Sequence, residues 1–201
     1  MKQYQPRIVA QAKSRHLNVG LMTHDGCMMS IGRTVSNEKC SDANKELKDL
    51  LRYKNIQSLV VAQKWGGHED ALLDKGVNAY NAMILYFKKQ DSSRKVFMLL
   101  DNPWDESKNR EFDIEHFEPS RFNIKEKLPN LNVLVPLPGD DSWSQGNKFI
   151  VSKLQENVIF IDAEQVLCPN GKCNFMNYKD NDHLRASYVR ENAVWIDQIF
   201  D

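Results

Sequence analysis

Short, almost uninterrupted apolar runs alternate along this chain with segments of helical periodicity, and this alternation limits the possible folds. The runs are rich in β-branched and large apolar residues. They cover residues 17–22, 58–62, 95–100, 131–135 and 158–161. Continuous apolar runs of this kind are typical of strands in a parallel sheet covered on both faces. The chain is therefore expected to fold as an α/β protein.

The helical patterns lie between and beyond these runs. Two sets of apolar residues each fall on one helix face: Val77, Tyr80, Ile84 and Phe87 in the first, and Val189, Ala193, Ile196 and Phe200 in the second. Residues 4–15, 43–53 and 143–156 are also predicted to be helical, with Pro6 in the first turn of its helix. Strands alternating with helices predict a three-layer α/β/α, flavodoxin-like fold with a mainly parallel sheet.

Composition narrows the class of protein. With 201 residues and 41% hydrophobic residues, the chain is expected to form a single domain over residues 1–201. Lysine plus arginine equals aspartate plus glutamate, at 27 each, so the basic excess of a nucleic-acid binder is missing. No apolar run reaches the length of a membrane span, and residues 1–5 contain no apolar signal core.

Four cysteines occur as two local pairs, Cys27 with Cys40 and Cys168 with Cys173. Disulfides are the favoured interpretation, with zinc binding and free thiols as alternatives. A bridge between Cys27 and Cys40 would stabilise the fold by about 3 kcal/mol. Disulfides imply an oxidising compartment, yet the chain carries no export signal, and a missing upstream region would resolve this conflict.

The strongest chemical signal is near the carboxyl terminus, where Asp180 precedes His183 by three residues in front of the last predicted helix. The carboxylate can accept a hydrogen bond from imidazole Nδ1 and leave Nε2 to take a proton from a hydroxyl. The alternative is a helix N-cap formed by Asp182 beside a solvated histidine.

The order Leu167-Cys-Pro-x-Gly-x-Cys173, then Tyr178-x-Asp180-x-x-His183-Leu184, then a closing helix resembles one family. This is the SGNH domain fused behind the membrane-embedded acyltransferase 3 family of bacterial O-acetylating proteins. The resemblance extends to the Cys27–Cys40 loop, to Leu59-Val-Val-Ala-Gln-Lys-Trp65, and to residues 3–8, which look like the helix after the Gly-Asp-Ser-His turn of the family.

The resemblance implies an acyltransferase or esterase domain with a Ser-His-Asp triad, in which His183 and Asp180 are two members. It implies a site at the periplasmic face of the bacterial inner membrane and a surface glycan such as lipopolysaccharide as acceptor. The implied partners are an acyl donor, that carbohydrate and an upstream membrane-embedded acyltransferase domain, with no cofactor, no metal and no nucleic acid.

The serine of the family's triad has no counterpart in this chain. The Gly-Asp-Ser-His turn of the family would stand immediately before Met1. The chain is therefore expected to be truncated at its N-terminus, to lack the first strand of the sheet and the nucleophile, and to be inactive as it stands.

An oxyanion hole needs fixed hydrogen-bond donors, and the resemblance places them at Gly26 and at Gly66-Gly67-His68, where His68 replaces the asparagine of many SGNH enzymes. A flexible turn at Gly66-Gly67 and a surface position for His68 are the alternatives. Trp65 is interpreted either as the floor of a sugar-binding cleft or as a half-buried structural residue.

Two other serines are weaker nucleophile candidates. Ser142 ends a Gly-Asp-Asp-Ser sequence, but an ordinary turn with Ser142 as a helix cap is the favoured interpretation. Ser30 lies near Cys27 in the sequence and is weaker still. Arg185 stands where the family often has serine or threonine, so Asp182 is expected to cap the last helix instead.

A second hypothesis is a degenerate SGNH-like module that binds glycan or docks on a membrane partner without catalysis. The absent serine and His68 in place of asparagine favour it. Under the enzyme hypothesis, Asp180 and His183 are predicted to lie within hydrogen-bond reach, with the imidazole facing a groove near Gly66-Gly67.

Overall fold

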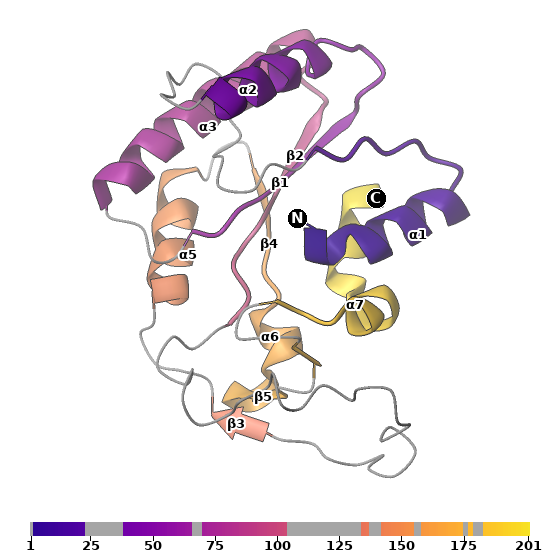
Figure 1. Ribbon diagram of the computed structural model, residues 1–201, viewed down its shortest axis with the longest axis vertical. Coiled ribbons are helices and arrows are strands. Elements are labelled where there is room, and N and C mark those ends of the chain that lie inside the picture. The colour runs from indigo at the N-terminus through magenta and orange to yellow at the C-terminus, as the bar shows by residue number, and fades with distance from the viewer. Residues whose placement is uncertain are drawn as a thin grey trace.

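The structure is a computed structural model that describes residues 2–22, 38–65, 70–103, 134–136, 142–154, 158–174, 177–178 and 183–201 (Figure 1). The helices are α1 (Gln5–Ser14), α2 (Glu38–Leu50), α3 (Asp70–Gln90), α5 (Ser142–Lys153), α6 (Glu164–Leu167) and α7 (Ala186–Asn192). Three 3-10 helices are η1 (Lys2–Tyr4), η3 (Pro169–Gly171) and η5 (Val194–Phe200). The strands are β1 (Ser58–Ala62), β2 (Lys95–Leu99), β3 (Leu134–Pro136), β4 (Ile159–Ile161) and β5 (Lys172–Asn174).

The main sheet is parallel, with strand order β1-β2-β4. Val60 is paired with Phe97, and Phe97 in turn with Ile159. Each connection between neighbouring strands contains a helix, α3 between β1 and β2 and α5 between β2 and β4, as parallel pairing requires. The α/β class with a parallel sheet, predicted from the apolar runs, is confirmed.

The strand predicted at residues 131–135 behaves differently from the parallel strands. Residues 134–136 form β3, which pairs antiparallel with β5 in a separate two-stranded sheet, with Val135 opposite Cys173. Pro136 has no backbone N–H to donate, so it suits the end of a short peripheral ladder better than a central strand. Assigning this run to the parallel sheet was wrong.

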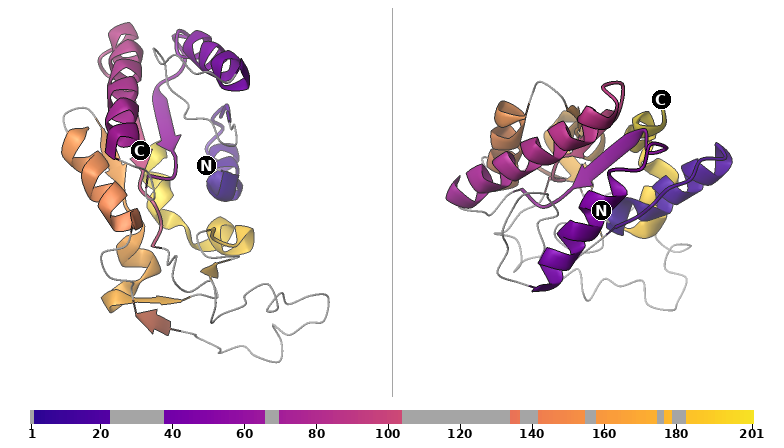
Figure 2. Two further views of the ribbon diagram at one scale, coloured as in Figure 1. Left: turned by 60° about the vertical axis from the view of Figure 1, so that its left-hand side comes forward. Right: turned by 90° about the horizontal axis from the view of Figure 1, so that it is seen from above.

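The two faces of the main sheet are buried against different helices (Figure 2). Alternate residues of β2 face opposite sides: Val96 and Met98 join the core of α3 and α5, whereas Phe97 and Leu99 join the core of α1, α7 and η5. Leu47 of α2 also packs into the first core. This is the expected three-layer arrangement.

The predicted helix faces are largely confirmed. Val77, Tyr80, Ile84 and Phe87 of α3 are all buried. Pro6 lies in the first turn of α1. The last predicted helix is divided at Ala193, where the α-helix α7 is followed by the 3-10 helix η5. The prediction of one continuous helix over residues 189–200 was therefore wrong.

Residues 17–22 were expected to form a strand, and the structure shows that this was wrong. Leu17 and Val19 are 49% and 39% exposed. Within the described residues, no strand pairing includes residues 17–22. The exposure of Leu17 and Val19 shows that this run is not buried between helix layers as the strands of the main sheet are.

A buried arginine joins the ends of two helices. Arg94 is 1% exposed and donates to the carbonyl oxygens of Leu51, Phe87 and Tyr53 at 3.1, 3.3 and 2.9 Å. Its guanidinium also lies over the ring of Phe87, 4.7 Å from the centroid. The carbonyl oxygens at a helix C-terminus need donors, and a cation is favourable there. Arg94 therefore caps α2 and α3 together from the inside of the core.

Candidate functional site

Polar residues follow the carboxyl ends of the three parallel strands. Asp101 and Asn102 come after β2, and Asp162 comes directly after β4. In open parallel sheets, ligands bind outside these strand ends. The candidate site is therefore sought at this edge of the sheet.

Tyr4 brings the start of α1 to this edge. Its side chain is 2% exposed, and its hydroxyl donates to Oδ1 of Asn102. Burial raises the pKa of Tyr4 far above its usual value, and the hydrogen bonds that its hydroxyl makes with Asn102 and Trp195 only partly oppose this. Tyr4 is thus a neutral anchor between the N-terminal helix and the end of β2.

The neighbouring residue, Gln3, lies in η1 and places the segment that leads into α1 beside His183. Gln3 Oε1 accepts a hydrogen bond from the backbone N–H of Leu184 at 2.9 Å. Leu184 is buried, at 3% exposed, and pairs with Tyr178 in an isolated antiparallel bridge. His183 itself is exposed. The start of α1 and the His183 loop are therefore in direct contact.

The loop that carries His183 is also fixed on its other side. Arg185 N–H donates to the carbonyl oxygen of Asn177 at 2.8 Å. Arg185 occupies the N-cap position of α7, and its side chain forms no capping hydrogen bond. Whether Asp182 caps this helix stays a prediction. Asp180 and Asp182 lie outside the described residues, and the predicted contact between Asp180 and His183 stays a prediction.

Two further tyrosines lie in or beside this loop, and sequence reasoning gave them no role. Burial, followed by the proximity of Tyr4, raises the pKa of Tyr178 far above its usual value. Burial raises the pKa of Tyr188 as well. Phenols with raised pKa values stay protonated at neutral pH, so they support the loop and do not act as bases. The sequence feature that could have indicated a role for Tyr178 is its position two residues before Asp180.

The segment after β1 is held by contacts with α3 and with the carboxyl end of β2. Asp101 Oδ2 accepts the backbone N–H of Trp65 at 2.8 Å, and the Trp65 indole donates to the carbonyl oxygen of Leu99 at 3.1 Å. The Trp65 ring meets Tyr80 edge to face, with 5.3 Å between ring centroids. Trp65 is only 1% exposed, so the proposed role as the floor of a sugar cleft is corrected to a core role. Large aromatic rings stabilise cores through the area they bury.

The remaining candidate oxyanion residues lie outside the described residues. These are Gly26, Gly66, Gly67 and His68.

Comparison with known families identifies the family to which the chain belongs. The family model described as "SGNH domain (fused to AT3 domains)" matches residues 1–193. The chain belongs to this SGNH family. No curated protein and no solved structure matches it. Membership places the chain among domains of the esterase and acyltransferase type, and it agrees with the α/β fold.

The SGNH domain contains a short disulfide loop next to the His183 segment. Cys168 and Cys173 are bonded to each other, and both are buried in the same core cluster as Leu184. Cys40 is also disulfide-bonded, whereas Cys27 lies outside the described residues. Among the described residues, no group of three histidine, cysteine, aspartate or glutamate side chains is placed to hold a metal ion.

The weaker nucleophile candidates receive no support from position. Ser142 is the first residue of α5, which agrees with a place at the start of a helix, and its side chain lies outside the described residues. Ser30 lies outside them too. Neither serine is shown near His183.

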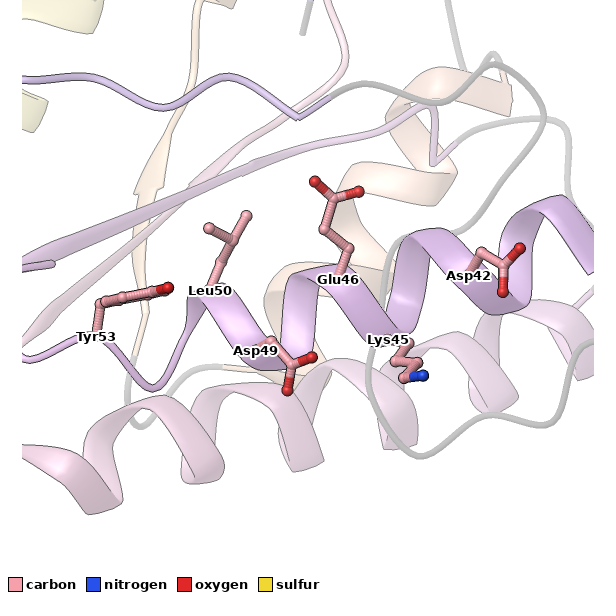
Figure 3. Close-up of a pocket in the computed structure, with 6 residues that line it drawn as sticks. All are labelled: Asp42, Lys45, Glu46, Asp49, Leu50 and Tyr53. Carbon is pink, nitrogen blue, oxygen red and sulfur yellow. The ribbon is translucent and has the colours of Figure 1, made fainter.

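A shallow groove of about 390 Å³ lies along α2, away from these residues (Figure 3). Its lining residues are Asp42, Lys45, Glu46, Asp49, Leu50 and Tyr53. None of them is a predicted site residue of the SGNH domain. A search of the described helices finds none that is both long and apolar enough to cross a membrane.

Proposed function

We propose that this SGNH domain takes part in serine-dependent O-acyl transfer or ester hydrolysis on cell-surface carbohydrate. The observation that carries the proposal is the contact of Gln3 with Leu184, which sets the start of α1 against the His183 loop. The hydrogen bond between Tyr4 and Asn102 holds the start of α1 at the carboxyl end of β2. A nucleophile entering α1 from this side would stand beside the imidazole.

The proposed chemistry follows from the groups at this edge. Asp180 accepts from Nδ1 of His183, and Nε2 removes the proton of a serine hydroxyl as its oxygen attacks the acyl carbonyl. Collapse of the tetrahedral intermediate transfers that proton to the leaving oxygen and leaves an acyl-serine. A carbohydrate hydroxyl or water then attacks the acyl-serine by the reverse sequence, which regenerates the serine.

Backbone N–H groups near Gly66-Gly67 are the proposed donors to the oxyanion. The serine of this mechanism is proposed to lie outside these 201 residues, in a strand and turn that enter α1. Support comes from β1, which within the described residues pairs on one side only and leaves its outer edge for another strand. The acyl donor, the glycan acceptor, a membrane-embedded acyltransferase partner and a periplasmic location remain parts of this proposal.

The decisive experiment compares two forms of the domain. One is the 201-residue chain, and the other carries an added N-terminal strand ending in a Gly-Asp-Ser-His turn. Hydrolysis of an acetyl ester is expected only in the extended form. Changing its added serine to alanine, or His183→Ala, should lower kcat by about a thousandfold or more.

The outcomes separate the competing functions. Turnover by the 201-residue chain that disappears in Ser142→Ala would overturn the proposed origin of the nucleophile. An extended form that is folded and inactive, yet binds an acetylated glycan in calorimetry, would favour the non-catalytic module. His68 in place of the usual asparagine is the sequence observation behind that second function.

A further inference from the structure

Asp101 and Asn102 are consecutive residues that contact two different parts of the candidate site. Asp101 accepts from the backbone N–H of Trp65, which directly precedes Gly66-Gly67. Asn102 accepts from the hydroxyl of Tyr4, which adjoins Gln3 and hence the His183 loop. Both residues are buried, at 9% and 4% exposed.

We propose that Asp101 and Asn102 form a positioning unit that sets Trp65, the last described residue after β1, relative to the contact of Gln3 with Leu184 beside His183. The unit touches no reacting atom in this mechanism and acts through Trp65 on one side and Tyr4 on the other. This inference rests on the proposed function, because it assigns the two loops to one site.

Asn147 of α5 holds the backbone of Asp101 in place. Asn147 is 7% exposed and forms hydrogen bonds with both the N–H and the carbonyl oxygen of Asp101. Its Oδ1 accepts the N–H of Asp101 at 2.8 Å, and its Nδ2 donates to the carbonyl oxygen of Asp101 at 3.0 Å. A two-point hydrogen bond of this kind fixes both position and orientation, because either bond alone would allow rotation. Asp101 is therefore anchored to the helix layer before its side chain reaches Trp65.

The choice of a buried carboxylate also favours a positioning role. Burying a charged side chain is costly unless hydrogen bonds compensate, and core packing alone would be served better by an apolar residue. Asp101 instead directs its carboxylate to the backbone of another loop. Positioning groups must hold a site to within a fraction of an ångström, and buried charge-assisted hydrogen bonds are suited to this task.

Amide hydrogen exchange in the 201-residue chain tests the contact directly. Asp101→Ala is expected to speed exchange at the Trp65 amide by about tenfold, and to move the amide signals of Gly66 and Gly67 in NMR spectra. Asp101→Asn keeps an oxygen acceptor and should restore both measurements. Asn102→Ala should leave the Trp65 amide unchanged and move the ring signals of His183.

Asp91→Ala is the matched control. Asp91 directly follows α3, away from the carboxyl ends of the strands, and its carboxylate also accepts a backbone N–H, from Ser93 at 2.9 Å within its own turn. It should change neither Trp65 nor His183. Unchanged Trp65 exchange in Asp101→Ala, equal acceleration throughout the core, or failure of Asp101→Asn to restore protection would each overturn the proposal.

The link to catalysis needs the form extended with a serine turn. There, Asp101→Ala should lower kcat about tenfold with KM within about twofold, and Asp101→Asn should recover kcat. An inactive extended parent would count against the proposed function and leave the exchange results as they stand. An active parent with unchanged kcat in Asp101→Ala would count against the positioning unit alone.

Discussion

The backbone N–H of Leu184 donates a hydrogen bond to Gln3 Oε1 across a sequence separation of 181 residues. This bond joins the residue after His183 to the first turn of the chain. Because Leu184 is buried and Gln3 adjoins the buried Tyr4, the contact is supported by the core on both sides. Its strength can be measured without any enzymatic assay.

Replacing Gln3 should loosen the His183 loop without unfolding the domain. Gln3→Ala removes the acceptor, and the expected loss is about 1 kcal/mol, seen as faster hydrogen exchange at the Leu184 amide. Gln3→Glu retains an oxygen acceptor and should keep the protection. Gln5→Ala is the control, because Gln5 is exposed on the same segment. Equal effects of Gln3→Ala and Gln5→Ala would argue against a specific contact.

Arg94 should be among the most sensitive positions in the fold. Arg94→Met removes the hydrogen bonds to the carbonyl oxygens of Leu51, Phe87 and Tyr53, and the free energy of unfolding should fall by about 3 kcal/mol in urea titrations. Arg94→Lys should recover little, because an ammonium group cannot reproduce the planar fork of donors. Lys89→Ala, at an exposed position near the end of α3, should change stability by less than about 0.5 kcal/mol. A similar loss in both variants would contradict the capping role.

Stability should decline in alkaline solution because of the buried phenols. The pKa of Tyr178 is raised above its usual 10.0 by burial, so the folded state holds its proton where the unfolded state releases it. The stabilisation is therefore complete below about pH 10 and is lost as pH rises above that value, by about 1.4 kcal/mol per pH unit for each such group.

Urea midpoints measured across this alkaline range provide the check. Tyr178→Phe should flatten the decline, whereas Tyr53→Phe should not, because Tyr53 is 65% exposed. An unaltered slope in Tyr178→Phe would show that other groups control alkaline unfolding.

The disulfide between Cys168 and Cys173 should contribute modestly because its loop is short. The two cysteines are five residues apart, and the chain-entropy model gives about 2 kcal/mol for such a loop. Replacing both by serine should lower the free energy of unfolding by that amount and shift the signals of the neighbouring Leu184. Adding a reductant to the double variant isolates any effect of the bond at Cys40. A double variant as stable as the parent would indicate that the bridge is dispensable for folding.

The parallel core could be predicted because its signals are local. Residues 58–62 form a continuous apolar run and became β1 with the predicted bounds, and the apolar face of α3 was also predicted correctly. Such patterns report burial, which the sequence encodes directly. Residues 17–22 carry the same signal and form no strand, because pairing depends on a partner that periodicity does not encode.

The candidate site was predictable only where a motif carried it. His183 was selected from the Asp-x-x-His spacing, whereas the roles of Gln3, Tyr4 and Asp101 arise from contacts between distant parts of the chain. For Trp65 the sequence left two interpretations open, the floor of a cleft or a half-buried structural residue, and its burial in the core favours the structural one. Residue type gives the chemistry that is available, and only the fold decides what each side chain touches.

Helix α1 is attached to the carboxyl-terminal residues, with a practical consequence for engineering. Arg7 forms an ion pair with Asp197, and Arg15 contacts Asp201 at 3.2 Å. The last residue thus lies near the end of a ten-residue helix, roughly 15 Å long, whose other end adjoins the first residues. A linker of about eight residues could join the two termini, and new ends could be opened at the exposed turn of Lys54 and Asn55. Such a circular permutant would keep the parallel core, and the linker that enters α1 could carry a grafted serine turn.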